Sequence, residues 1–373
     1  YGNLIFDNNM HVSFNGEVHF MATVPGKNIT SAGQTFNSSI FFDGVGGEWS
    51  LSDDFYSFSY VNLNNGTLRT NNHNVNWSIF NSSNSNTRGL YLGSSTVTTI
   101  QFYLSCSAPN LTFDAGTSHL VVSYGGYVYG ADQDFYRITF TAGGSSIGTN
   151  VLDKITFGDN ANIQPCSNTG NFFHEAEFQK NGDIYGNNTF ENLTFSPGNI
   201  YKLGAGNTQY ITTNGTMNAS GDCSNFIAIF STTPGQVTTI SKPSGSINLS
   251  KVALRDNITT GGATFTATNS VDITNNAGWN FTSDLPRNLY WVNGAGNWSD
   301  TGHWSLNSGG AGGECIPTPF DNVFFDQNSG FVSSDVVQLN NSLAFCYDMS
   351  WAGVNGNPTL SSDFSKTLFI YGN

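Results

Sequence analysis

The sequence predicts an all-β protein built from β-solenoid, or β-helix-like, segments. The prediction rests on the composition, on recurring apolar triplets and on the turn-forming residues between them. Charged residues make up 10 % of the 373 residues and aromatic residues 14 %, with 42 Gly, 30 Phe and 15 Tyr. Disordered chains are usually rich in charge and poor in aromatic residues, so this composition indicates an ordered core. Strand-forming residues are frequent, and the best helix formers are few.

Short apolar triplets recur along the first two thirds of the chain, many of them about 20 residues apart. Two apolar residues flank a third residue in each triplet, which is typical of a strand with one buried face. Clusters of Gly, Asn and Ser between the triplets provide turns. The triplets begin at Val18, Ile40, Val61, Leu90, Leu111, Ile138, Ile155 and Leu193.

Two architectures give strands at such intervals. A β-solenoid uses about 20 residues per coil and stacks each coil on the one before. A chain of β-sandwich modules is the alternative, and it places turn signals every 8–12 residues. Low charge with abundant Asn and Thr favours the solenoid, because stacking sets like residues above one another at about 4.8 Å, where charges repel.

The composition changes after about residue 278, where Trp, Gly and Pro become frequent. We expect three parts: a solenoid-like module over residues 1–284, a Trp-rich cap or junction over 285–320, and the first coils of a further repeat over 321–373. A cap is expected because a bare strand edge at the end of a solenoid invites unwanted pairing.

The tripeptide at the start of the chain, Tyr1-Gly2-Asn3, recurs as Tyr371-Gly372-Asn373, 370 residues later. Together with the resumed triplet pattern after residue 320, this repetition indicates one period of a tandem array followed by the start of the next. We therefore expect the sequence to be part of a longer chain.

Several segments carry a resemblance to a known family. They are "LYWVNGAGNWSDTGHWSLNSGGAGGECIPTPFDNVFFD", "CYDMSWAGVNGNPTL", "FFDGVGGEWSL", "NTRGLYLGSSTV" and "FENLTFSPGN". The most specific feature is the W-x6-W-x5-W spacing followed by P-x-x-x-D-N-V-x-F. These segments resemble the tandem modules of giant surface proteins of gliding Bacteroidota, the gliding-motility adhesins exported by type IX secretion.

This resemblance implies an extracellular, cell-surface fibre whose modules serve attachment, gliding or force transmission. It implies neighbouring copies of the same module as partners, with a surface polysaccharide or substratum as a further partner, and no catalytic residues. Two alternatives remain open: a carbohydrate-binding or carbohydrate-active β-helix protein, and a filament or sheath subunit that polymerises without covalent links.

The net charge of −14 makes nucleic acid an unexpected partner, because an acidic surface repels phosphate. No apolar run approaches the roughly 20 residues that span a membrane. Of the five Cys, none forms a C-x-x-C pair, which suits an exported protein with one or two disulfides. We expect Cys315 to pair with Cys346, closing a loop worth about 3 kcal/mol, and Cys166 with Cys223.

Three pairs of carboxylates are candidates for acid/base chemistry: Asp53 with Asp54, Asp132 with Asp134, and Glu175 with Glu177 beside His174. A glycosidase needs two carboxylates that converge in a groove. In a strand, Glu175 and Glu177 share one face, which also describes an ordinary solvated surface. We favour that interpretation and expect no enzyme activity.

Oxygen-rich, Gly-rich loops near the Trp cluster could bind Ca²⁺. The candidate ligands are Asn297, Asp300, Asp321 and Asp326. The alternative is that these side chains cap turns with their own backbone. Calcium is the one cofactor that the sequence suggests. The Trp side chains could stack on sugars, but we expect them to pack against the end of the solenoid.

Overall fold

Main-chain pairing between successive coils builds the fold. The structure is a computed structural model that describes residues 2–166, 170–282 and 286–372. The fold is a β-solenoid with 52 % of its residues in strands, which confirms the fold class predicted from the sequence. Within the described residues there is one short 3-10 helix, η1 (Thr301–His303), and no helix long and apolar enough to cross a membrane. The chain forms two compact units, residues 1–193 with 207–216 and residues 194–206 with 217–373.

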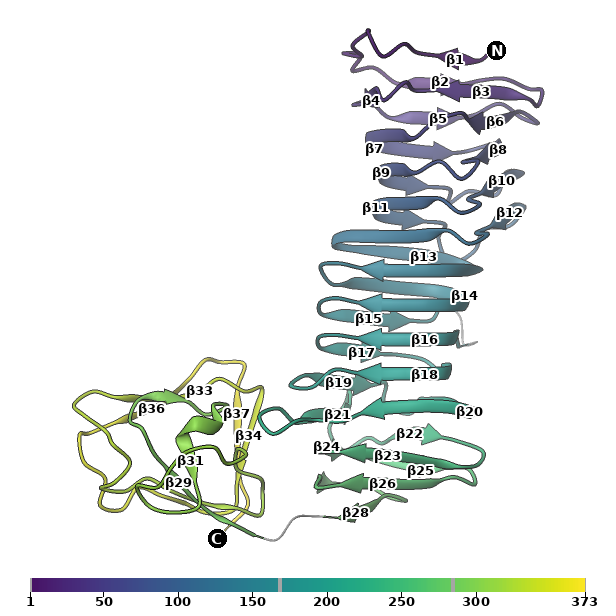
Figure 1. The fold of residues 1–373 in the computed structure, drawn as a ribbon. Coiled ribbons are helices and arrows are strands. Elements are labelled where there is room, and N and C mark those ends of the chain that lie inside the picture. The colour runs from purple at the N-terminus through teal and green to yellow at the C-terminus, as the bar shows by residue number, and fades with distance from the viewer. Residues whose placement is uncertain (1, 167–169, 283–285, 373) are drawn as a thin grey trace. The chain divides into compact units, whose positions relative to one another are not determined.

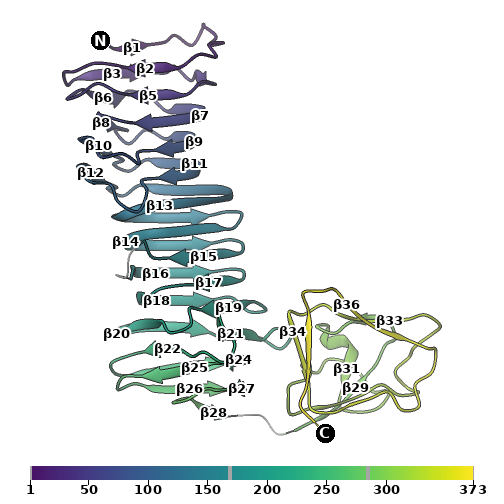
Figure 2. The same ribbon diagram turned by 180° about the vertical axis from the view of Figure 1, so that it is seen from behind.

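The first unit carries one sheet, here called face A, to which each successive coil contributes one parallel strand as far as residue 114 (Figure 2). Side chains alternate along these strands: Trp49 and Leu51 are buried, and Glu48 and Ser50 point outward. Its strands are β1 (Leu4–Ile5), β3 (Lys27–Thr30), β6 (Glu48–Leu51), β8 (Gly66–Arg69), β10 (Arg88–Tyr91) and β12 (Leu111–Asp114).

Two further faces of the first unit, B and C, are joined by strands that bend at a corner (Figure 1). In β7, residues 55–57 pair on face C and residues 61–63 on face B. The strands that begin in this unit are β2 (Val18–Phe20), β4 (Thr35–Phe36), β5 (Ile40–Phe42), β7 (Phe55–Leu63), β9 (Val75–Asn81), β11 (Thr96–Tyr103), β13 (His119–Phe140), β14 (Gly144–Phe157), β15 (Ala161–Gln164), β16 (Phe172–Phe178), β17 (Gly182–Ile184), β18 (Thr189–Phe195) and β20 (Thr208–Ala219).

Stacked aromatic side chains fill the core of the first unit. Phe157 lies between Phe140 and Phe178, with ring centroids 5.0 and 4.7 Å away, and all three side chains are fully buried. Phe20 stacks on Phe42 in the same way at 4.9 Å. These distances match the spacing between paired strands, so the coil-to-coil pairing itself brings like side chains into contact.

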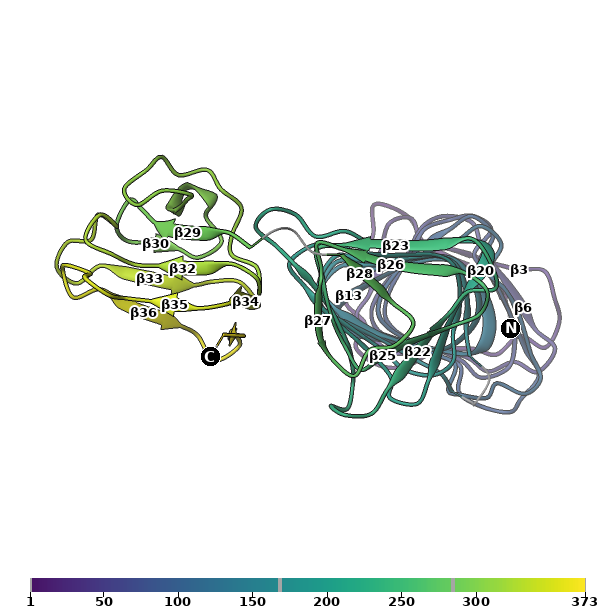
Figure 3. The same cartoon turned by 90° about the horizontal axis from the view of Figure 1, so that it is seen from below.

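The second unit continues with parallel coils that have three sides, visible in the view from below (Figure 3). One side pairs β23, β26 and β28, another pairs β22 with β25, and the third pairs β21, β24 and β27. The strands are β19 (Ile200–Leu203), β21 (Ile227–Ser231), β22 (Thr238–Ser241), β23 (Ser246–Ser250), β24 (Val252–Arg255), β25 (Asn257–Thr260), β26 (Thr264–Thr268), β27 (Val271–Thr274) and β28 (Asn280–Thr282).

Residues 288–370, also in the second unit, form a short stack with its own core, here called the tryptophan stack. Parallel pairing runs from β29 through β32 to β35, from β30 through β33 to β36, and from β34 to β37. Its strands are β29 (Asn288–Trp291), β30 (Gly296–Asn297), β31 (Trp304–Ser305), β32 (Asn322–Phe324), β33 (Val336–Leu339), β34 (Leu343–Cys346), β35 (Met349–Ser350), β36 (Thr359–Ser362) and β37 (Thr367–Ile370).

The tryptophan stack bears on the expected division at residue 320. β29 pairs directly with β32, and Trp291, Trp298 and Trp304 share one buried cluster with Phe325. The Trp-rich segment therefore packs as the first layer of the coils that follow it. The expected boundary at 284/285 lies outside the described residues, as do Tyr1 and Asn373 of the repeated tripeptide.

Candidate functional site

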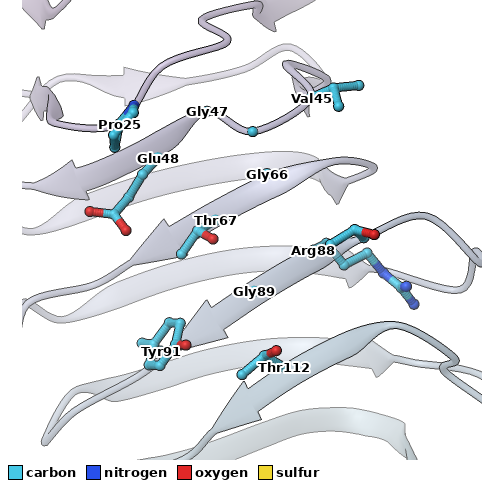
Figure 4. A pocket seen from close by; sticks show the side chains of 12 residues that line it. Pro25, Val45, Gly47, Glu48, Gly66, Thr67, Arg88, Gly89, Tyr91 and Thr112 are labelled. Carbon is cyan, nitrogen blue, oxygen red and sulfur yellow. The ribbon is translucent and has the colours of Figure 1, made fainter.

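A hollow of about 440 Å³ opens on face A, where successive strands carry small residues between larger ones (Figure 4). Gly66 and Gly89 have no side chains, so the floor of the hollow lies close to the backbone there. A Cβ atom on Gly89 would lie 2.9 Å from the Thr67 hydroxyl, so a larger residue would both crowd this strand and fill the space. The hollow is also lined by Glu48, Thr67, Tyr91 and Thr112.

Glu48 and Tyr91, which line the hollow, both contact Arg69 beside it. Arg69 Nε lies 3.1 Å from Glu48 Oε2, and the Arg69 guanidinium carbon lies 3.9 Å above the centre of the Tyr91 ring. Arg69 and Tyr91 are paired neighbours on β8 and β10, so coil stacking sets the cation over the aromatic face. The hollow can accept a small hydroxyl-rich ligand, but one face of its aromatic ring is already covered.

Arg88, at the edge of the hollow, has a structural role. Its side chain is buried and donates hydrogen bonds of 2.7 to 2.9 Å to the carbonyl oxygens of Ser82, Asn86 and Pro109 and to the Ser82 hydroxyl. Burial lowers the pKa of this guanidinium from its ordinary value. Its four acceptors lie in two successive loops, so Arg88 ties those loops together.

The acidic strand around His174 has its charges paired between coils. Lys154 Nζ contacts Glu175 Oε1 at 2.6 Å and Glu177 Oε2 at 3.8 Å, while His174 Nδ1 lies 2.8 Å from Glu191 Oε2. A hollow of about 510 Å³ is lined by Glu191, Asn192, Thr212, Thr213 and Asn214. Its lining contains one carboxylate, whereas acid/base cleavage of a glycosidic bond requires two.

Asp53 and Asp54 cap the turns of other coils. Asp53 accepts hydrogen bonds from the backbone N–H groups of Ser31 and Ala32, at 2.7 and 2.6 Å. Asp54 accepts one from the backbone N–H of Asn74 at 2.8 Å. The two carboxylates thus link corners about one coil apart, which is a structural use.

Each carboxylate among the four expected calcium ligands has a local partner. Asp300 Oδ1 accepts from Gly302 N at 2.8 Å at the start of η1, and Asp326 Oδ2 accepts from the Ser308 hydroxyl at 2.6 Å. Asp321 is buried and paired with Arg287 at 2.8 Å. Asn297 lies exposed in β30. Across the described ranges, no group of three or more His, Cys, Asp or Glu side chains could hold a metal ion. Calcium binding stays a prediction.

The three fully buried Trp side chains of the tryptophan stack converge edge to face. Trp304 lies 5.1 Å from Trp291 and 4.8 Å from Trp298, measured between ring centroids. Trp304 Nε1 donates to the Trp298 carbonyl at 2.9 Å. Burial closes these rings to an external sugar, so they serve packing.

The expected disulfide pairings are wrong. The structure joins Cys106 to Cys166 and Cys223 to Cys315, across 60 and 92 residues, in place of Cys315–Cys346 and Cys166–Cys223. Cys346 is a buried free thiol in β34, and burial, together with the charge of Asp348, raises its pKa to about 12. Sequence distance misled the prediction, because the loops that bring cysteines together belong to different coils.

Sequence reasoning missed the face A hollow, although a signal for it existed. Arg69 and Tyr91 are 22 residues apart, close to one coil length, so they could have been placed side by side.

The fold defines the chain as a β-solenoid protein. Comparison with protein-family models, with curated proteins and with solved structures finds no match.

Proposed function

We propose that this chain is a structural and adhesive module of a long extracellular fibre on a cell surface. The observation that carries the proposal is the parallel ladder of main-chain hydrogen bonds that joins each coil to the next. Because these bonds run along the stacking direction, a load applied along it is shared by all the bonds of a coil. Stacked Phe side chains inside the coils fix their register.

The surface chemistry suits a role outside the cell. Two disulfides tie together segments that are distant in sequence, and such bonds persist in oxidising compartments. The acidic, sparsely charged surface also disfavours nucleic acid. Adhesion further requires a surface that can hold a ligand, and the hollow on face A supports the proposal as a candidate for such a surface.

The native protein tests this proposal. We expect protein sheared from the cell surface to run on a denaturing gel as a chain many times longer than 373 residues, and to appear in electron micrographs as a thin fibre. Cells that lack the protein should lose attachment. Short chains that form a filament and separate in denaturant would instead indicate a non-covalent sheath.

A second outcome would point to an enzyme. Polysaccharide cleavage by the purified chain that disappears in Glu175→Gln and Glu177→Gln variants would replace the adhesive function with a carbohydrate-active one. We expect no release of reducing ends from soluble polysaccharides by the wild-type chain or by either variant.

A further inference from the structure

A groove of about 460 Å³ runs along the corner between faces B and C of the first unit. The strands β7, β9, β11 and β13 bend at this corner, and their pairing registers shift there. Successive coils place Phe58, Ser78, Ile100 and Ser123 one above another, and Tyr124 follows Ser123 directly. The groove therefore crosses several coils in the direction in which they stack.

Two aromatic rings stand exposed at the ends of this groove. Phe58 is 67 % exposed and Tyr124 is 83 % exposed, although the buried positions of the same coils hold most of the other large apolar side chains. They are three coil steps apart, about 14 Å at the usual strand spacing. Neither ring contacts another ring within the described residues. Both rings are thus accessible to a ligand.

The backbone at Tyr124 is strained in a way that supports a functional use. Tyr124 has φ of +55°, a left-handed conformation that Gly or Asn adopts far more readily than a bulky aromatic residue. Gly125 and Gly126 follow it, and Gly125 also has a positive φ of +68°. Strain of this kind is concentrated at functional sites. A bulky aromatic side chain at a position suited to Gly is therefore a second reason to examine this corner as a site.

The lining between the rings is uncharged and combines polar with apolar side chains. Its residues are Asn76, Trp77, Ser78, Thr98, Thr99, Ile100 and Ser123. The hydroxyl of Thr99 donates to the Gln101 carbonyl at 2.9 Å and so belongs to the wall. The side chains of Asn76, Ser78 and Thr98 make no hydrogen bond to any other part of the described chain. They can offer an amide and two hydroxyls to a ligand.

We propose that this corner groove binds an uncharged polysaccharide that lies along the stacking direction, with one sugar ring on Phe58 and another on Tyr124. The apolar C–H face of a sugar stacks on an aromatic face, and its hydroxyls pair with amide and hydroxyl groups. The groove contains no ionised side chain in a chain with a net charge of −14, so a neutral ligand matches it and an anionic one does not. The inference rests on the adhesive function proposed above.

The groove suits such a ligand better than the hollow on face A. In that hollow Arg69 covers the Tyr91 ring, and Glu48 neutralises Arg69. In the corner groove both rings and three polar side chains are unoccupied. The spacing of the rings also sets the minimum length of the ligand, because one sugar cannot reach both rings and a chain of several sugars can.

Affinity electrophoresis of the purified chain in gels containing hydroxyethylcellulose, xyloglucan, dextran or alginate tests the proposal. We expect retardation by at least one of the neutral polymers and none by alginate. Tyr124→Gly should weaken that binding about tenfold and leave the melting temperature unchanged or higher, because Gly relieves the strained backbone. Phe58→Ser should weaken binding by a similar factor, and oligosaccharides should bind more tightly than monosaccharides.

Phe364→Ala is the matched control, since its ring is fully exposed outside the groove. That variant should bind like the wild type. The proposal is overturned if no neutral polymer retards the wild-type chain, or if binding survives both groove variants. In either case, a native protein that still forms covalent fibres and still attaches cells would show that the adhesive function stands and that only the groove assignment fails.

Discussion

The first unit and the tryptophan stack use the same parallel pairing but fill their interiors differently. In the first unit, Phe140, Phe157 and Phe178 lie in line, each at the same place in its coil, with interplanar angles of 14° and 25°. In the tryptophan stack, Trp291 and Trp304 meet at 89°. The tryptophan stack also stacks Phe325 on Trp351, at 3.7 Å and 5°, so its core adds an edge-to-face cluster to the repeated contact.

This difference separates two sources of order in a solenoid. A repeated stack needs the same side chain once per coil, so each coil supplies the packing surface for the next. A convergent cluster needs different residues at unlike positions, and the same region contains a buried carboxylate, Asp321, that is paired with Arg287. A substitution should therefore lower stability mainly through lost packing in the first unit, and also through lost polar contacts in the tryptophan stack.

The largest expected effect is the loss of one ring from the middle of the Phe stack. Phe157→Ala should lower the free energy of unfolding by about 4 kcal/mol, because it removes a large buried side chain and leaves a cavity. Phe157 also contacts rings on both sides, so two stacking contacts are lost together. Urea unfolding followed by circular dichroism measures the change.

Phe157→Leu is the control, because it keeps most of the volume and should cost less than about 1.5 kcal/mol. Equal losses for the two variants would show that ring stacking, and not cavity formation, dominates the core of the first unit.

In the tryptophan stack, the corresponding weak point is the ion pair between the half-buried Arg287 and the buried Asp321. Asp321 accepts from Arg287 Nε and Nη2 at 3.1 and 2.8 Å and from the Thr318 backbone N–H at 2.8 Å. Asp321→Asn should lower the free energy of unfolding by about 3 kcal/mol, because the guanidinium loses its buried counter-charge. Thermal unfolding followed by Trp fluorescence measures the change, because four of the seven Trp lie in this region.

Asp326→Asn provides the comparison, since that carboxylate is bonded to neutral partners, Ser308 and Asn328. It should change stability by less than about 1.5 kcal/mol. A calcium-dependent rise in melting temperature that both substitutions abolish would contradict the structural role of Asp321 and support the calcium site predicted from the sequence.

The sequence was sufficient to predict the solenoid because each coil repeats the same physical requirement. Ile40 pairs with Val61, and Ile138 with Ile155, as expected for triplets about one coil apart. The faces could not be predicted. The triplets at Ile40 and Val61 lie on face B, while those at Leu90 and Leu111 lie on face A, where Leu90 pairs with Phe113. Because the corners vary in length, triplets with the same pattern fall on different faces.

Site prediction was limited by the same corners. Cys106 and Cys166 are joined because two loops meet in space, and no local pattern encodes which loops meet. The exposure of Tyr124 depends on a left-handed backbone at one bend. Candidate acids such as Glu175 were identified by type, but their partner Lys154 sits one coil away, and its pairing required the register.

A smaller effect should follow from a corner glycine of the first unit. Gly116 has φ of +55°, and a Cβ atom there would lie 2.4 Å from the Gly93 carbonyl oxygen of the coil before it. Gly116→Ala should cost about 2 kcal/mol, because the backbone must shift between coils. Gly206 also has a positive φ, +73°, but nothing within 4 Å of the added atom. Gly206→Ala should cost about 1 kcal/mol. Urea unfolding measures both, and equal costs would show that the left-handed conformation alone matters.

The smallest expected effect comes from an exposed charged contact in the first unit. His19 stacks on Phe41, and its Nδ1 lies 2.6 Å from Asp43 Oδ2 while its Nε2 lies 3.2 Å from Glu17 Oε2. Hydrogen bonds to Asp43 and then to Glu17 raise the pKa of His19 above its ordinary value. The stabilisation is complete below about pH 6.5 and is lost as the pH rises through the raised pKa.

His19 is 42 % exposed, so solvent screening limits the effect to less than about 1 kcal/mol. Melting temperatures of the wild-type chain and a His19→Gln variant, measured from pH 5 to pH 9, should converge at the alkaline end and differ most at the acidic end. A gap that widens toward high pH would reverse the assigned sign. A gap as large as that of Phe157→Ala would mean that charge pairing, and not aromatic stacking, holds these coils together.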